Sequence, residues 1–425
     1  MLVRQVHYVR AHPTSWQIWA VSLLLAVMPL CFAVSSRLKI VPMLLLSLIG
    51  LVLLITRMET RLSYRVAWSV IAVCLLRLLY DIGNFLGHGL GWITLDLPAQ
   101  TLLFMAIAAV FTLPLKQRVI AIGFSLTALV LGAASLYQRY AQGVDRPFGL
   151  NGGDWAAVEF AMYLLALVLL SMLQALRPGT RRGDRWLHIT AVVIGLYGAV
   201  LTQSRGPLLA FAPIYLGLML WYAMRSRHWR RVLVLFAVTV LGMLAVTATL
   251  HHEMVERLTD VPAEIARYNT GSSNDAAGAI GERLEMWRTA WQAFLEHPLA
   301  GIGLDQFGVY VREQAATGNA SPAIAKYVHP HSEYLESLVA GGLPALLVLL
   351  LFFAVPLAFF ARHLNHAQEP VAAASAAGLM VLGMYGLCAF SDNVFYRAMP
   401  QSLYLFLVLG LAVSIGHQLR NASPR

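Results

Sequence analysis

The residues best suited to chemistry gather in the stretch KYVHPHSEYLESLVAGGLPALL, residues 326–347, just ahead of a long apolar run. A neutral imidazole can accept a proton from a hydroxyl group, so either histidine of this stretch is a candidate general base. Pro330 fits the first turn of a helix that we expect to begin near His329 and to run inward. His331 then lies at the helix N-terminus, where the helix dipole disfavours imidazolium. We therefore predict His331 as the base and His329 as a cap or supporting group.

The same His-x-His pair could instead bind a metal ion. It supplies only two ligands, however, and the nearby loop offers no obvious third carboxylate at tight spacing. Glu333 and Glu336 are more simply explained as acidic groups that stabilise the positive end of the helix. We therefore expect no metal and no other cofactor.

Two arginines are candidates for holding an anion. Arg205 lies in LTQSRGPLLAF, in a very short turn between two apolar runs, and its planar guanidinium suits phosphate oxygens. Arg283 and Arg288 lie in ERLEMWRTAWQAFLEHP, whose apolar residues recur at helical spacing and whose helix should end before Pro298. Arg283 shares a helix face with Trp287, whereas Arg288 points well away from Arg283. Each of these arginines could also be a surface charge that binds lipid headgroups.

Composition fixes the fold class that must position these groups. The chain has 425 residues, of which 59% are hydrophobic and 12% charged, so one soluble core cannot bury its apolar surface. Runs of about 20 apolar residues predict an all-α integral membrane protein with about twelve transmembrane helices, and uniformly apolar runs exclude a barrel. The expected spans are 15–34, 40–56, 66–86, 97–114, 119–138, 156–176, 186–203, 207–224, 232–250, 335–361, 371–390 and 401–416. Arg77 and Asp81 should form an ion pair inside the third span.

The connections between spans predict the orientation. The tails and alternate connections on one side contain eighteen Lys and Arg residues, and the opposite short connections contain six. By the positive-inside rule both termini are cytoplasmic, and the long connection faces outward. The expected organisation is helices 1–9 in residues 1–250, an outward loop with interfacial helices in 251–334, and helices 10–12 in 335–425. The formal charge of +10 is thus largely an orientation signal, and we expect no nucleic-acid partner.

Three stretches together carry a family resemblance. TQSRGPLLAF, ERLEMWRTAWQAFLEHPLAGIGLDQF and HPHSEYLESLVAGGLPALL resemble, in order and spacing, the signature stretches of the O-antigen ligase and polymerase superfamily, with ligases of the WaaL type as the best match. The resemblance implies a GT-C-like polytopic bundle in the bacterial inner membrane with a periplasmic active site. It further implies metal-independent, inverting transfer of O-antigen from undecaprenyl diphosphate to a sugar hydroxyl of lipid A-core. The expected partners are these two lipid-linked substrates and membrane lipids.

The resemblance also assigns residues. It implies that Arg205 and Arg283 bind the diphosphate and that His331 is the catalytic base. Ser332 stands where family members often have asparagine. The residues expected to support the site are Arg288, His329, Glu333, Tyr334, Asp392 and Arg397.

Other functions remain compatible with these motifs. An O-antigen polymerase or a protein O-oligosaccharyltransferase of the same superfamily would share the donor chemistry and differ in acceptor. A transporter of lipid-linked glycans would use the arginines to bind substrate without making a bond. Transporters usually place their sites near the bilayer midplane, whereas this polar cluster lies at one surface, which favours an enzyme.

Overall fold

The described part of the chain is helical and contains no strand. The computed structural model describes all residues except 1–13, 36, 151–155, 227–228, 250–278 and 423–425. Ten helices in the described residues are long and apolar enough to cross a membrane, and a bent pair, α2 and α3, would make an eleventh. The prediction of an all-α, multi-pass membrane protein is therefore confirmed, with a described span count slightly below twelve.

The helices follow the predicted apolar runs closely. The first half contains α1 (Ser15–Val34), α2 (Ile40–Thr56), α3 (Met58–Val66), α4 (Trp68–His88), η1 (Trp92–Leu95), α5 (Asp96–Ala108), η2 (Ala109–Thr112), α6 (Gln117–Tyr140), α7 (Ala157–Leu176) and α8 (Arg182–Leu201). The second half contains α9 (Arg205–Ser226), α10 (Trp229–Thr249), α12 (Ala279–Glu296), α13 (Phe307–Ala316), η3 (Pro322–Ile324), α14 (Glu333–His363), α15 (Glu369–Cys388) and α16 (Ala398–Ala422). The helix α10 occupies the predicted ninth span, although it is not among the ten candidate membrane spans.

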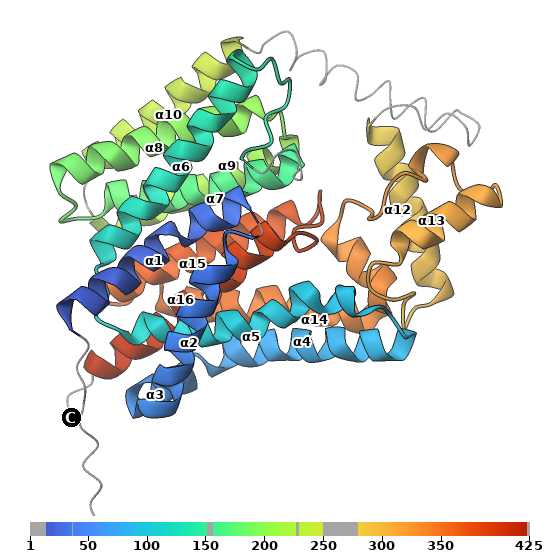
Figure 1. The fold of residues 1–425 in the computed structure, drawn as a ribbon. Helices are drawn as coiled ribbons and strands as arrows, with labels where there is room; N and C mark the ends of the chain where they lie inside the picture. The colour runs from blue at the N-terminus through green and yellow to red at the C-terminus, as the bar shows by residue number, and fades with distance from the viewer. Residues whose placement is uncertain (1–13, 36, 151–155, 227–228, 250–278, 423–425) are drawn as a thin grey trace, which may run out of the picture.

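Three helices form the centre of the bundle. Nearly every side chain of α7 is buried, and α15 and α16 are buried along most of their length. In Figure 1, α6, α8 and α10 lie on one flank of these helices, and α4, α5 and α14 lie on the other. The outer helices keep leucines and valines exposed on one face, as expected where lipid replaces water as the solvent.

The helices α12 and α13 stand apart from the membrane bundle, beside one end of α14 (Figure 1). Met286, Ala290 and Ala293 of α12 are buried in a small second core together with Phe307 and Val311 of α13. The helix α12 ends at Glu296, before Pro298, as predicted. Trp291 on its opposite side is 49% exposed, so much of the predicted apolar stripe is available to a membrane surface.

A break in α14 fixes this outer unit to the bundle. Gly341 and Gly342 depart from helical geometry, and Gly342 has φ of +65°. The break leaves the carbonyl groups of residues 339 and 340 open to partners outside the helix. They accept hydrogen bonds from the backbone N–H groups of Ile302 (2.8 Å) and Gly303 (3.0 Å). The loop that follows α12 is thereby bonded directly to the open turn of α14.

The start of α14 differs from the expectation. We expected a helix beginning near His329, but α14 begins at Glu333 with Ser332 as N-cap. The Ser332 hydroxyl accepts from the backbone N–H of Leu335 at 3.5 Å, which satisfies one of the free amides of the first turn. His331 therefore precedes the helix and is not part of its first turn.

Candidate functional site

His331 and Asp392 form the centre of the candidate site. The Nδ1 atom of His331 lies 2.9 Å from Oδ1 of Asp392, although the residues are 61 positions apart. Asp392 lies in the connection between α15 and α16, and its side chain is almost fully buried. When Nδ1 donates to this carboxylate, the lone pair of His331 is on Nε2, which is the arrangement that a general base requires.

The backbone around His331 is held in an unusual conformation. His331 has φ of +51°, in the left-handed region that residues with a side chain seldom adopt. The next residue fixes this geometry, because the N–H of Ser332 donates to Oδ1 of Asn393 at 2.9 Å. The N–H of Glu333 in turn donates to the carbonyl of Ala389 at 2.9 Å. Three consecutive residues are thus bonded to the connection that carries Asp392.

The charges of the two buried partners are set by their surroundings. Burial favours a neutral Asp392, but the hydrogen bond from His331 and the nearby imidazoles outweigh burial and hold the pKa of this carboxyl below its usual value. Burial, with the charge of His331 as a smaller cause, lowers the pKa of His329 to about 4. At neutral pH the site therefore contains an ionised Asp392 and a neutral His329.

The turn that carries Arg205 packs against the same connection. Arg205 is exposed and begins α9. A Cβ atom placed on its neighbour Gly206 would lie 2.2 Å from Oγ of Ser391, so the two turns are in close contact. Ser391 directly precedes Asp392, which brings the predicted diphosphate-binding arginine to the edge of the His331 site.

The helix α12 approaches His331 from the other side. The indole N–H of Trp287 donates to the carbonyl of Pro330 at 3.0 Å, and the ring of Tyr327 lies 5.5 Å from that of His331. The hydroxyl group of Tyr327 donates to Glu282, which is next to Arg283. Arg283 is half-buried on the face of α12 that carries Trp287, and among the described residues it has no hydrogen bond or ion pair. It is therefore a cation on the face of α12 that contacts Pro330, the residue before His331.

Arg288 has a different environment. Its guanidinium forms a bidentate ion pair with Glu285, with distances of 2.7 and 2.9 Å, and donates to the carbonyl of Asn319 at 2.7 Å. These bonds join α12 to the loop before η3. The supporting role expected for Arg288 stays a prediction.

The other expected supporting residues lie around this centre. The His329 ring lies 4.5 Å from that of His331 and 4.6 Å from that of Tyr396. Glu333 accepts from Arg77 of α4 at 3.3 Å, and Arg77 also contacts Asp81 at 3.9 Å, which confirms the predicted pair. Tyr334 donates to the carbonyl of Gly386 at 2.8 Å, and Arg397 pairs with Glu159 of α7 at 2.8 Å.

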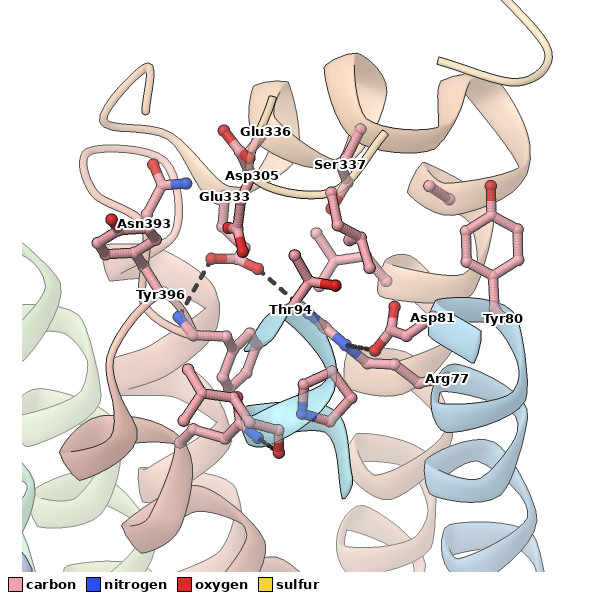
Figure 2. Close-up of a pocket in the computed structure, with 18 of the residues that line it drawn as sticks. Arg77, Tyr80, Asp81, Thr94, Asp305, Glu333, Glu336, Ser337, Asn393 and Tyr396 are labelled. Carbon is pink, nitrogen blue, oxygen red and sulfur yellow. Dashed lines mark hydrogen bonds and ion pairs between the residues drawn. The ribbon is translucent and has the colours of Figure 1, made fainter. Parts of the chain in front are cut away.

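A cavity of about 420 Å³ lies next to this centre, and Glu333 and Asn393 are among the residues that line it (Figure 2). Its wall includes the second half of α4, the first half of α14, the start of α5 and the connection before α16. Among the described residues that line it, Arg77 is the one basic residue, against the carboxyl groups of Asp81, Asp96, Asp305, Glu333 and Glu336. The formal charge of this lining, with each carboxyl group counted as ionised, is therefore negative. Tyr396 lines the cavity and also contacts His329, so it connects the cavity to the histidine pair.

Some residues of the site carry no signal in the sequence. Arg146 donates to the carbonyl of Thr202 at 3.1 Å and to Ser204 at 3.4 Å, which fixes the turn before Arg205. In the sequence, Arg146 is only one of the six basic residues of the opposite short connections, which indicate orientation. Asn393 is next to Asp392 in FSDNVFYR, but its bond to Ser332 depends on the packing of α14 against α15, which no local pattern predicts.

Comparisons with known proteins identify a related family and one relative. The family described as O-Antigen ligase matches residues 190–350, from within α8 to within α14, and this range includes Arg205, Arg283 and His331. An uncharacterized protein of Haemophilus influenzae is 24% identical over 276 residues, which cover 64% of this chain and 67% of that protein. Asp392 and Arg397 lie beyond the family match.

Proposed function

We propose that the chain is an O-antigen ligase, because residues 190–350 match the family described as O-Antigen ligase. It transfers O-antigen polysaccharide from undecaprenyl diphosphate to a sugar hydroxyl of lipid A-core at the periplasmic face of the bacterial inner membrane. The observation that carries the proposal is the bond between His331 and Asp392, with the Arg205 turn packed against Ser391 and α12 bonded to Pro330.

The chemistry needs a base and a cationic site. The acceptor hydroxyl is a weak nucleophile unless its proton is removed as it attacks, and His331, oriented by Asp392, takes that proton. The bond between the anomeric carbon and the diphosphate breaks in the same step, so the anomeric configuration is inverted. Arg205 and Arg283 stabilise the negative charge of the departing diphosphate, which is a role that a metal ion plays in many other transferases.

The distribution of charge separates the two substrates. A diphosphate is disfavoured in the acidic cavity, since five carboxylates line it against one arginine. Carboxylates and the phenol of Tyr396 can bind sugar hydroxyl groups, so the cavity suits the acceptor glycan better. In this arrangement the donor diphosphate lies on the side of Arg205 and Arg283, and the acceptor reaches His331 past Tyr396.

The acceptor distinguishes this function from its alternatives. A polymerase would accept a second carrier-linked glycan, and a protein O-oligosaccharyltransferase would accept a serine or threonine of an exported protein. The described part of the outward segment adds only α12, α13 and η3 to the bundle, with no separate protein-binding domain, which favours the ligase.

Purified components test the proposal. The full chain, a polyprenyl diphosphate-linked glycan and lipid A-core are combined with a chelator, and products are separated by electrophoresis. We expect glycan on lipid A-core and none when the acceptor is omitted. Extension of the carrier-linked glycan alone would indicate a polymerase, and transfer that requires further proteins would contradict the ligase assignment.

A further inference from the structure

We propose that His329, His331 and Asp392 form a binding site for a transition-metal ion of the zinc type, and that an ion bound there inhibits the enzyme. The metal-binding part does not depend on the proposed function. The inhibitory part rests on the proposed function, because it assumes that His331 is the base.

The three side chains provide a suitable set of donor atoms. Each offers one ligand atom, and these atoms all lie within 4.8 Å of one another. Two imidazoles and one carboxylate are a common three-ligand set for zinc, with a fourth position left to water. The sequence provides only the two histidines at close spacing, and folding adds Asp392 from a distant connection.

Two of these side chains contain buried polar atoms that lack a partner. His329 is 8% exposed and Asp392 is 3% exposed. Within the described part of the chain, Nδ1 of His329 and Oδ2 of Asp392 have no hydrogen-bond partner. A buried polar atom without a partner is unfavourable, and a metal ion bound by these two atoms would satisfy both.

Side-chain rotation is needed to complete the site. Ligand atoms bound tetrahedrally to zinc at about 2.1 Å lie about 3.4 Å apart, so the ion must draw together donor atoms that now lie up to 4.8 Å apart. The backbone is already constrained, because Trp287 holds the Pro330 carbonyl between the two histidines and Asn393 holds Ser332. Imidazole ligands favour zinc, copper and nickel over magnesium and calcium, so the site should discriminate between these groups.

A bound ion would remove the base. Coordination of His331 through Nδ1, the nitrogen that faces Asp392, replaces that hydrogen bond and leaves the ring proton on Nε2, so neither nitrogen keeps a free lone pair. The acceptor hydroxyl could then no longer transfer its proton to His331. The enzyme would therefore need no metal for activity and would lose activity when zinc is present.

Zinc binding to the full chain in detergent tests the site directly. Titration calorimetry with Zn²⁺ alone should show one more ion bound to the wild-type chain than to the His329→Gln chain, or an affinity at least 10-fold higher. The His297→Gln chain is the matched control, since His297 is an exposed histidine just beyond α12. If His329→Gln does not fold, Asp392→Asn provides the same comparison with a side chain of equal size. Equal binding by the wild-type chain and a folded ligand variant would overturn the site.

Transfer assays test the inhibition separately. Zn²⁺ should suppress transfer by the wild-type and His297→Gln chains alike, a chelator should restore it, and Mg²⁺ should have no effect. Zinc binding at His329 without loss of transfer would overturn the inhibitory part. A chain that binds zinc as described but never transfers glycan would refute the proposed function and leave the metal site intact.

Discussion

At the scale of single residues, the site depends on the hydrogen bond between His331 and Asp392. Asp392 fixes which ring nitrogen carries the proton and keeps the other directed away from the carboxylate. Asp392→Asn preserves shape but removes the charge, so we expect transfer to fall by about 10–100-fold. The assay compares this variant with Asp145→Asn, because Asp145 is an exposed aspartate whose pair with Arg139 lies outside the site. Equal rates for the two variants would remove Asp392 from the mechanism.

Two arginines on α12 offer a matched comparison. We expect Arg283→Gln to reduce transfer by about 10²–10³-fold, because it removes a cation that stabilises the leaving diphosphate. Arg288→Gln should keep most activity and lower the free energy of unfolding by about 1–3 kcal/mol, because it removes the partner of the buried Glu285 carboxylate. Rates and thermal unfolding are measured on both variants. A larger catalytic loss for Arg288→Gln would reverse the roles given to them.

The sequence suggests candidate site residues more readily than their partners. His331, Arg205 and Arg283 are candidates because each lies in a short motif of typical composition. Asp392 was a candidate only through the family resemblance, and its pairing with His331 spans 61 positions. Such a contact depends on how α14, α15 and α16 pack, and no periodicity within one segment encodes it.

At the scale of elements, the broken turn of α14 connects α12 and α13 to the membrane bundle. A Cβ on Gly342 would lie 2.3 Å from the carbonyl oxygen of Pro298, and its positive φ disfavours any side chain. We expect Gly342→Ala to destabilise the protein by about 1–3 kcal/mol from backbone strain alone, and to reduce transfer by displacing α12. Thermal unfolding and transfer rate are both measured.

The control for this change is Gly217→Ala. Gly217 lies inside α9 with no atom within 4 Å of an added Cβ, so alanine should be neutral or stabilise by up to about 1 kcal/mol. Similar behaviour of the two variants would mean that the break in α14 is not required.

Apolar runs predict helices well and their exact starts less well. The run after residue 334 indicates a membrane helix, but Pro330 suggested a start at His329, whereas Ser332 is the observed cap. The choice depends on the bonds from residues 332 and 333 to the connection before α16. These bonds stabilise the left-handed backbone of His331, and the helix therefore does not extend one turn further toward the N-terminus.

At the scale of the whole molecule, the central prediction is the orientation. Gly183 at the start of α8 should face the cytoplasm, and Glu313 on α13 should face the periplasm. Both residues are exposed and lie outside the apolar runs. In intact cells, an impermeant maleimide should label Glu313→Cys, and it should label Gly183→Cys only after the inner membrane is opened. The reverse pattern would place the active site on the wrong side for a periplasmic ligase.

Overall topology was the part most accessible from sequence. Composition alone requires a multi-pass helical protein, because so much apolar surface must be satisfied by lipid. The small difference in span number concerns two places. The helices α2 and α3 form a pair bent by 99°, and α10 is not among the candidate spans. Burial of α7, α15 and α16 at the centre could not be predicted, since all the spans are similarly apolar.

The most direct test of the central claim is the rate of glycan transfer by His331→Ala in the purified, chelator-treated system. The account predicts a loss of about 10²–10⁴-fold, with wild-type thermal unfolding and intact binding of the donor. A correctly folded His331→Ala chain that transfers O-antigen to lipid A-core at the wild-type rate would contradict it.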